Sequence, residues 1–485
     1  MYGNAIIEAA GKPYLSILQA ALSQAAHESQ DAQANPGVDA RGQGPNAFYD
    51  RISDGYYTSA LIEAIKGHLS DSVELLLAKG ADPNGMPLKC MEIYSTAFIR
   101  RPRLQRERHP YYTYPKPRSV LIQEADMPQS GNPTQEELEE RREMFAPSCF
   151  WGHNGYSRSR QNAAKTALEV AAEVGDMESL ERVMHYHPDI SFWTAPNQQA
   201  VRNSPRHSSL STANPLTIAI QGSHTQVIQR LLQADFNPNI YQSSTPTVAV
   251  TPLMATAMLN SHDAGLCYFE LLVKESKHPI DLIVRTPIFG INIVHMAAAS
   301  LSLPMLKAIA THFPSSLTAL TCKTALQHSP LHIACLALDD SHINWQSLAI
   351  ATSIKDVRTL DLDWCPQHPP ASYSKVDLED KVELDVEPNS SLALPQPTDY
   401  FKAQYDVIKF LLDACPGQAA ADSRDLYGNT PLHYLASYRT INMNALELLL
   451  ESEASQEAWM QAQNEWGYTP HDLFEKGIAA LDPGR

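Results

Sequence analysis

Three histidines, His295, His332 and His433, are the side chains of this sequence best suited to proton transfer or metal binding. An imidazole titrates near neutral pH, so it can act as a general acid or base, and in its neutral form it binds metal ions. Each of the three follows a short polar residue at the same distance, namely Asn292, Ser329 or Thr430. The repeated spacing indicates one local structure used three times, which has to be identified before any chemistry is assigned.

Cysteine and histidine at short spacing offer a second kind of chemistry, because thiolate and imidazole together can bind zinc. Such pairs occur at Cys365 with His368 and at Cys149 with His153, but neither has a second convincing ligand pair nearby in the sequence. A zinc-dependent hydrolase is therefore a remote alternative. The sequence also lacks the glycine-rich phosphate loops, the nucleophile elbow and the zinc-protease helix motif. We expect no enzyme, no metal and no cofactor.

A basic and aromatic run between residues 100 and 118 could contact nucleic acid, with guanidinium groups on phosphates and tyrosine rings stacked on bases. The residues that would do so are Arg100, Arg101, Arg103, Arg106, Arg108, Tyr111, Tyr112 and Tyr114. A nuclear regulator acting through this run is the main alternative function. The run could equally be a nuclear-import signal or a surface loop, and as a loop it could pair with the acidic stretch Asp377–Glu387 as an internal latch.

The net charge and the cysteine pattern limit the kinds of partner and the cellular compartment that we expect for this protein. The net charge of −17 disfavours non-specific binding to nucleic acid, because the phosphate backbone would be repelled. The seven cysteines are odd in number and scattered, unlike a disulfide framework, so a reducing compartment is expected. No signal-peptide core and no apolar stretch of membrane-spanning length can be drawn. We expect a soluble protein of the cytosol or nucleus that has no membrane partner.

Helix starts followed by a second, apolar helix recur along the chain. The clearest is Thr430-Pro431-Leu432-His433, in which Thr is the N-cap and Pro takes the first helical position. Related openings lie at Ser59, Thr166, Asn214, Thr251, Asn292, Ser329 and Thr469. Second helices are predicted at Val73–Leu77, Leu180–Met184, Val227–Leu232, Phe269–Val273, Met305–Ile309, Val407–Leu412 and Ala445–Leu450. A further pair without a Thr-Pro start is predicted at Ala5–Ala10 and Leu15–Leu22.

These openings resemble the ankyrin repeat, whose signature is Thr-Pro-Leu-His-x-Ala. Ser329 to Ala334 matches it almost fully, and the turns Gly80–Asn84 and Asp235–Asn239 resemble those that close an ankyrin unit. The resemblance implies an all-α solenoid of about seven to nine helix-turn-helix units with short β-hairpin turns. It also implies that the three histidines hydrogen-bond within and between repeats. The residues that carry this structural motif are Thr251, Pro252, His295, Ser329, Pro330, His332, Thr430, Pro431 and His433.

Two long interruptions divide the predicted array. Repeats are expected at 1–84, 163–340 and 401–485, with insertions at 85–162 and 341–400. Within the first insertion, Thr134 and Glu137 have capping-box spacing, which predicts a short helix over Gln135–Met144. The second insertion is acidic and rich in Pro and Ser, as solvated linkers are.

A non-catalytic scaffold or adaptor for one or more protein partners is the function that the resemblance implies. Stacked hairpins form a concave surface lined by turn tips, where large aromatic and charged side chains make effective contacts. The candidate partner-binding residues at these tips are Arg285, Phe289, Asp425, Tyr427, Glu465 and Trp466. The aromatic ones could instead pack between neighbouring repeats. The sequence identifies no particular partner.

Overall fold

A computed structural model gives the fold of this chain. It describes residues 5–32, 48–51, 56–85, 165–197, 214–240, 250–259, 261–286, 290–314, 320–324, 327–335, 400–415, 423–437, 441–464 and 467–481. The described residues are mostly helical, with a single two-stranded antiparallel sheet among them. The predicted helix at Gln135–Met144 lies outside them. None of their helices is long and apolar enough to cross a membrane.

The described residues fall into two compact units, which are treated separately below. Unit 1 comprises those within Met1–Tyr114, Trp151–Thr256 and Cys267–Asp281, and unit 2 those within Ala257–Leu266 and Leu282–Arg485. One helix, α16 (His262–Glu275), runs across the division.

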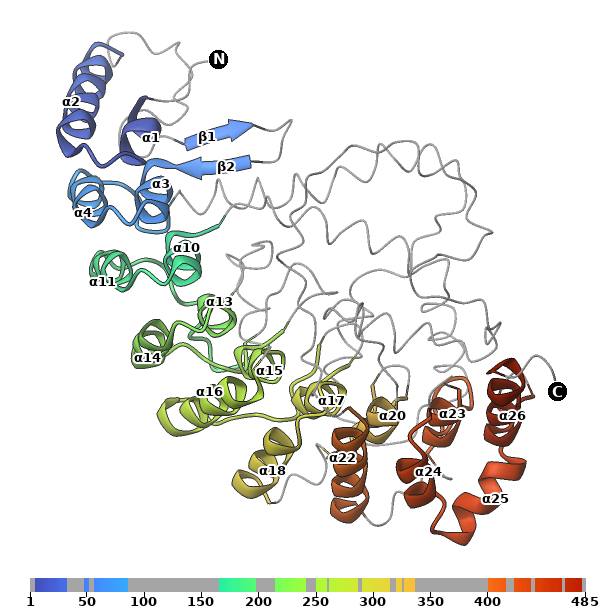
Figure 1. The fold of residues 1–485 in the computed structure, drawn as a ribbon. Coiled ribbons are helices and arrows are strands. Elements are labelled where there is room, and N and C mark those ends of the chain that lie inside the picture. The colour runs from blue at the N-terminus through green and yellow to red at the C-terminus, as the bar shows by residue number, and fades with distance from the viewer. Residues whose placement is uncertain are drawn as a thin grey trace, which may run out of the picture. The chain divides into compact units, whose positions relative to one another are not determined.

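Unit 1 is a series of helix pairs, each packed on the next. Its first helices α1, α3, α10, α13 and α15 contact one another in turn, and its second helices α2, α4, α11 and α14 do the same, so two rows run side by side (Figure 1). The helix bounds are Ala5–Ala10 for α1, Leu15–Ala32 for α2, Ala60–Lys66 for α3, Ser70–Ala78 for α4, Ala167–Val174 for α10, Met177–His185 for α11, Pro215–Gln221 for α13, Thr225–Gln233 for α14 and Pro252–Thr256 for α15. The sheet joins β1 (Phe48–Arg51) to β2 (Tyr56–Ser59), which leads into α3.

Polar caps set where these first helices begin. The Thr166 hydroxyl accepts a hydrogen bond from the Glu169 backbone N–H at 3.1 Å, and the Glu169 carboxylate accepts one from the Thr166 N–H at 2.6 Å. Together they satisfy two N–H groups that a helix start otherwise leaves unpaired. Asn214 caps α13 through its side chain, with Pro215 at the first helical position as the sequence predicts.

Turns in unit 1 are tied to each other by asparagine side chains. The Asn84 carboxamide oxygen accepts a hydrogen bond from the Asp189 backbone N–H at 2.9 Å, and the Asn239 carboxamide oxygen accepts one from the Asp281 N–H at the same distance. Because each bond joins one turn to the turn of the following helix pair, the predicted turns at Gly80–Asn84 and Asp235–Asn239 also fix the spacing between pairs.

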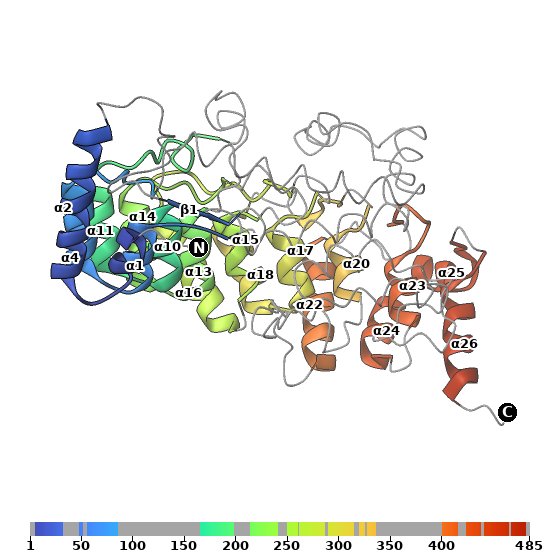
Figure 2. The ribbon, with the colours of Figure 1, turned by 90° about the horizontal axis from the view of Figure 1, so that it is seen from above.

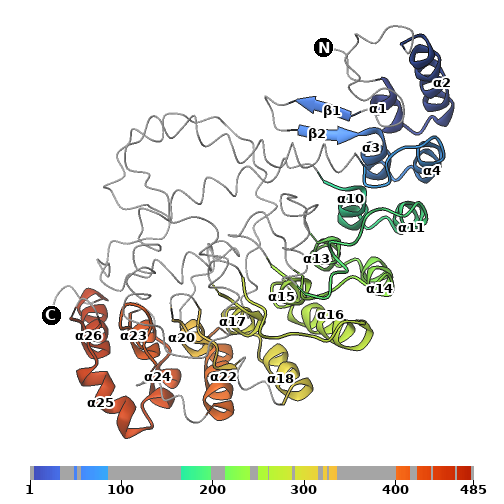
Figure 3. The same ribbon diagram turned by 180° about the vertical axis from the view of Figure 1, so that it is seen from behind.

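Unit 2 repeats the same arrangement. Its first helices α17, α20, α23 and α26 form one row, and its second helices α18, α22 and α24 form another, as the view from behind shows (Figure 3). From above, α20 lies beside α22 and α23 beside α24 (Figure 2). The bounds are Ile293–Ala299 for α17, Leu303–His312 for α18, Pro330–Cys335 for α20, Tyr400–Ala414 for α22, Pro431–Ala436 for α23, Met443–Leu449 for α24, Glu453–Gln461 for α25 and Pro470–Leu481 for α26.

The core of unit 2 surrounds its first helices. Every residue of α17, α20 and α23 is buried. The apolar faces of the second helices cover them, with Leu306, Val407 and Leu446 among the buried side chains. The predicted second helices are confirmed in both units, although each of the observed helices begins or ends a few residues beyond the apolar run that predicted it.

Candidate functional site

Three buried histidines form a repeated set of hydrogen bonds in unit 2, called here the histidine ladder. The Nε2 atom of His295 contacts the carbonyl of His328 at 3.3 Å, that of His332 the carbonyl of Asn429 at 3.2 Å, and that of His433 the carbonyl of Tyr468 at 3.0 Å. Each carbonyl belongs to the residue directly before the helix start of the next pair: Ser329, Thr430 and Thr469. The same bond therefore links four successive first helices, α17, α20, α23 and α26.

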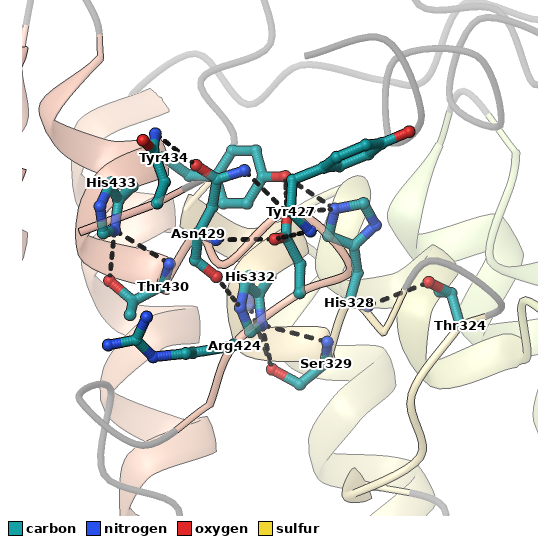
Figure 4. Close-up of polar contacts among 12 residues, drawn as sticks. Thr324, His328, Ser329, His332, Arg424, Tyr427, Asn429, Thr430, His433 and Tyr434 are labelled. Carbon is teal, nitrogen blue, oxygen red and sulfur yellow. Dashed lines mark hydrogen bonds and ion pairs between the residues drawn. The ribbon is translucent and has the colours of Figure 1, made fainter. Parts of the chain in front are cut away.

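The other ring nitrogen of each histidine serves its own helix. Nδ1 of His332 lies 3.1 Å from the Ser329 backbone nitrogen, and Nδ1 of His433 lies 3.0 Å from that of Thr430 (Figure 4). His295 caps Asn292 in the same way at 3.3 Å. In His332 and His433, Nδ1 thus accepts from a cap N–H while Nε2–H donates to a carbonyl, which assigns the neutral imidazole with its proton on Nε2. Nδ1 of His295 also lies 2.6 Å from the Asn292 carboxamide oxygen.

Burial keeps the ladder histidines neutral. It lowers the pKa of His295 and of His332 to about 3, with the charge of Arg285 and of His328, respectively, as the next cause. Burial likewise lowers the pKa of His433 to about 4. A cation in the buried interior would lose its hydration. None of the three is therefore poised for proton exchange at neutral pH.

A row of basic side chains runs from pair to pair in the same unit. Arg285 donates to the carbonyl of Lys323 at 3.2 Å, Lys323 to that of Arg424 at 3.3 Å, and Arg424 to that of Gln463 at 2.9 Å. We call Arg285, Lys323 and Arg424 the basic row. Arg424 is exposed, whereas the other two are half-buried. The row fixes the segments that precede the helix starts.

A third set of polar contacts in unit 2 is a closed cluster of His328, Asp425 and Tyr434. Nε2 of His328 is 2.7 Å from the Tyr434 hydroxyl and 3.3 Å from the Asp425 carboxylate, and the Tyr434 hydroxyl donates to that carboxylate. Asp425 also accepts hydrogen bonds from the backbone N–H groups of Tyr427 and Asn429 (Figure 4). The cluster joins the segment before α20 to the turn before α23, which are about a hundred residues apart in sequence.

The cluster has the residue types of a general acid–base site without access to a substrate. The side chains of His328 and Asp425 are 1% and 0% exposed. Burial by itself raises the pKa of Asp425, but the hydrogen bond from His328 and the histidine charges outweigh it and lower the pKa to about 2. Burial and the Asp425 charge raise the pKa of Tyr434 well above its ordinary value. The arrangement stabilises a carboxylate and holds a turn in place.

The predicted partner-binding residues divide into three groups. Asp425 is 6% exposed, so its prediction as an exposed tip contact is corrected: its oxygens are used inside the fold. Arg285 is half-buried and also donates to the Cys322 sulfur at 2.9 Å. Tyr427 is half-buried, and its ring points away from the cluster (Figure 4). Phe289, Glu465 and Trp466 lie outside the described residues.

Other predicted sites also fall outside what the structure describes. These are the nucleic-acid candidates Arg100–Tyr114 and the cysteine–histidine pairs at 149/153 and 365/368. Within the described part of the chain, no group of three or more His, Cys, Asp or Glu side chains could hold a metal ion.

Two features of unit 2 were missed by sequence reasoning, although signals for both are present. Lys323 and Arg424 stand at the same distance before their helix caps, Ser329 and Thr430, so the basic row has a periodic signature. His328 and Tyr434 carry no such signal. Their contact depends on which helix pairs are neighbours, and the long insertion between them conceals this.

Comparisons with known proteins give structural likenesses and no sequence relative. No protein-family model matches the chain, and neither does any curated protein. Among the solved structures that match is the ankyrin repeat domain of Bcl-3, described as a unique member of the IkappaB protein family. The match covers 65% of this chain and 96% of that one, with 13% sequence identity and a TM-score of 0.34.

Proposed function

We propose that this chain is a non-catalytic scaffold of ankyrin type, a solenoid that binds a protein partner through its turn tips. The observation that carries the proposal is the histidine ladder, in which His295, His332 and His433 make the same bond between successive pairs. A stack held in this way is a regular framework, and regular frameworks of repeats bind macromolecules along their turns and first helices. We also propose that the protein is located in a reducing compartment, the cytosol or the nucleus, as the sequence predicts.

The chemistry of unit 2 supports binding over catalysis. Burial holds the three ladder imidazoles neutral, and the closed cluster of His328, Asp425 and Tyr434 is shut off from solvent. The thiol of Cys335 is fully buried, and burial raises its pKa, which suppresses the nucleophilic thiolate. Side chains with catalytic potential in this unit are thus engaged in holding it together.

The turn between Arg424 and Asn429 is the contact region that we propose for the partner. Asp425 and the basic row hold this turn, in which Tyr427 is half-buried and Arg424 is exposed. An aromatic ring and a guanidinium on a preorganised turn are effective interface anchors, because little conformational entropy is lost on binding. We include Trp466 in the proposed contact from the sequence alone, as a predicted tip residue outside the described residues.

The test compares the full chain with its Tyr427→Ala, Trp466→Ala double variant in quantitative cross-linking and affinity measurements on the captured partner. We expect affinity to fall by about tenfold or more, because central aromatic anchors dominate interface energy. Lys409→Ala, an exposed position on the second helix α22, is the control and should bind as the wild type does. All three proteins should melt at the same temperature. Equal binding by the double variant and the wild type would refute the proposed contact region.

A further inference from the structure

The basic row, Arg285, Lys323 and Arg424, concentrates positive charge in unit 2 of a chain whose net charge is −17. Helices α17, α20 and α23 and the segments that lead into them lie within residues 282–302, 320–335 and 423–437. In sequence, these stretches contain three Lys or Arg residues, which are the members of the row, and a single Asp or Glu, Asp425. The Asp425 carboxylate is buried and accepts hydrogen bonds inside the fold. The segments along the first helices are therefore locally basic.

The two arginines of the row form no ion pair within the described residues. Arg285 contacts the Lys323 carbonyl and the Cys322 sulfur, and Arg424 contacts the Gln463 carbonyl. A carbonyl orients a guanidinium without neutralising its charge, and a guanidinium has more N–H donors than these contacts use. Arg285 and Arg424 therefore keep both charge and donors with which to bind a carboxylate.

Arginines on the second helices of unit 1 differ, because their charges are paired inside the fold. Arg182 on α11 lies 2.8 Å from the Glu178 carboxylate and 3.3 Å from that of Glu74. Arg230 on α14 lies 2.6 Å from the Glu181 carboxylate. A guanidinium binds a carboxylate more strongly than it binds a neutral carbonyl. The described fold thus supplies carboxylates to these arginines and leaves those of the basic row to a ligand.

The members of the row lie one helix pair apart. Arg285 reaches the carbonyl of Lys323, and Lys323 reaches that of Arg424. Each ladder histidine also has one row member near it, whose charge adds to burial in lowering the pKa of that histidine. Row and ladder therefore share one spacing. Packed helices lie about 8–10 Å apart, so neighbouring row members are separated by roughly this distance.

This spacing matches one conformation of a bound peptide. The polyproline II helix has three residues per turn and a rise of about 3.1 Å per residue, so every third side chain lies on the same side, about 9 Å further along. In a β-strand, side chains on one face are instead about 7 Å apart. A polyproline II segment with a carboxylate at every third residue fits the row in both charge and spacing.

We propose that the basic row binds an acidic segment of a protein partner, held in the polyproline II conformation with Asp or Glu at every third residue. The proposal rests on the partner-binding function proposed above and extends its contact region from the Arg424 turn to the two preceding helix pairs. A nucleic acid fits less well, because the acidic remainder of the chain repels a dense run of phosphates. Three partly exposed charge pairs are weak, so the dissociation constant for such a segment alone should be on the order of 10–100 μM at low salt.

Titration of the full wild-type chain with two isomeric peptides tests the spacing. Both peptides are proline-rich, have blocked termini and contain three Asp residues. In one the Asp residues occur at every third position, and in the other they are consecutive. We expect the first to bind about threefold or more tightly than the second, measured by fluorescence anisotropy, and added salt to weaken the binding. Equal affinities, or binding that salt does not weaken, would overturn the proposal.

A pair of double variants tests whether the row is the binding site. Arg285→Gln with Arg424→Gln removes two charges from the row, and glutamine keeps an N–H donor for the carbonyl contacts. We expect it to weaken binding of the regularly spaced peptide by about fivefold or more. The matched control, Lys307→Gln with Lys409→Gln, removes two exposed charges from the second helices α18 and α22 and should bind as the wild type does. Equal losses in both double variants would attribute the binding to net charge and contradict a site on the row.

Two other occupants of the row give different results. A single-stranded oligonucleotide that displaces the peptide and binds more tightly would assign the row to nucleic acid. Peptide binding that is seen only after deletion of Asp377–Glu387 would assign the row to the acidic stretch of the chain itself. Either result would overturn the proposal of an acidic partner segment.

Binding of the captured partner distinguishes failure of this proposal from failure of the proposed function. If the Tyr427→Ala, Trp466→Ala variant loses the partner while the Arg285→Gln, Arg424→Gln variant keeps it, the partner binds at the turn without an acidic segment. The proposed function would then stand, and the role of the basic row would be refuted.

Discussion

Each ladder histidine is a neutral bridge between two helix pairs. Its Nδ1 contacts the cap of its own helix, its Nε2 contacts a carbonyl of the next pair, and burial keeps the ring neutral. Replacing such an imidazole leaves buried N–H and carbonyl groups unpaired, each at a cost of about 1–3 kcal/mol. Neutrality is therefore part of how unit 2 is held together.

Acid should destabilise unit 2 through these histidines. Their pKa values of about 3, 3 and 4 lie below the ordinary value of 6.5, so the unfolded chain binds more protons than the folded one. Their contribution is complete above pH 6.5 and is lost as the pH falls towards their folded values. From pH 6.5 to pH 5 we expect a loss of roughly 2 kcal/mol per histidine, measured by urea unfolding at fixed pH values.

The effect of one ladder histidine on the pH dependence of stability can be separated from the effects of other titrating groups by a single variant. His332→Gln should flatten the dependence of the unfolding free energy on pH by about one proton between pH 6 and pH 5. Asp425 does not contribute there, because its pKa is lowered from 3.8 to about 2 and its contribution is lost only below that range. An unfolding free energy that is constant from pH 7 to pH 5 would contradict the assignment of neutral, buried imidazoles.

The roles of some individual residues can be predicted from the sequence, and those of others cannot. The repeated spacing of His295, His332 and His433 behind their capping residues identifies them, because cap and ring act within one helical turn. Asp425 was misplaced because a charged residue in a turn is expected to face solvent. Its burial depends on His328 and Tyr434, and contacts made by tertiary packing leave no local pattern.

Among the elements, the capped first helices are the most clearly determined by local sequence. Thr166 and Glu169 form a capping box on α10 that is itself buried, with exposures of 3% and 2%. Water cannot replace either bond at such a site. Helix α10 also lies between α3 and α13, so its start positions two neighbours.

Thr166→Ala should lower the free energy of unfolding by about 1 kcal/mol or somewhat more, because the Glu169 N–H loses its acceptor. Thr166→Ser keeps the hydroxyl and should retain most of the stability. Chemical unfolding of the full chain followed by circular dichroism measures both. If the serine variant were as unstable as the alanine variant, the hydroxyl would not be the stabilising group.

The pairing of helices could be predicted from sequence, whereas their ends could not. Apolar spacing identified second helices such as Val407–Leu412, but α22 begins at Tyr400, because residues 400–406 mix aromatic, charged and polar side chains and form no continuous apolar run. The predicted second helix Leu15–Leu22 continues to Ala32 for a similar reason. Propensity reports that a helix exists more reliably than where it stops.

At the scale of the whole molecule, the main structural question is which helix pairs pack against one another. In unit 2 the ladder bond from His295 spans 33 residues of sequence and that from His433 spans 35, but the one from His332 spans 97. The Gln404 side chain likewise donates to the Ala334 carbonyl across 70 residues, at 3.0 Å. Packing therefore continues from α20 to α22 and α23 across the long second insertion. Sequence reasoning found the insertion and could not show that the pairs on its two sides are neighbours.

A double-mutant cycle on His328→Ala and Tyr434→Phe tests most directly whether these pairs interlock. The two side chains are 106 residues apart in sequence and 2.7 Å apart in the fold, and both are buried. We predict a coupling free energy of about 1–3 kcal/mol from urea unfolding of the four proteins, as for groups that share a buried network. Effects that add to within about 0.3 kcal/mol would contradict direct contact across the insertion, and with it the continuous stack.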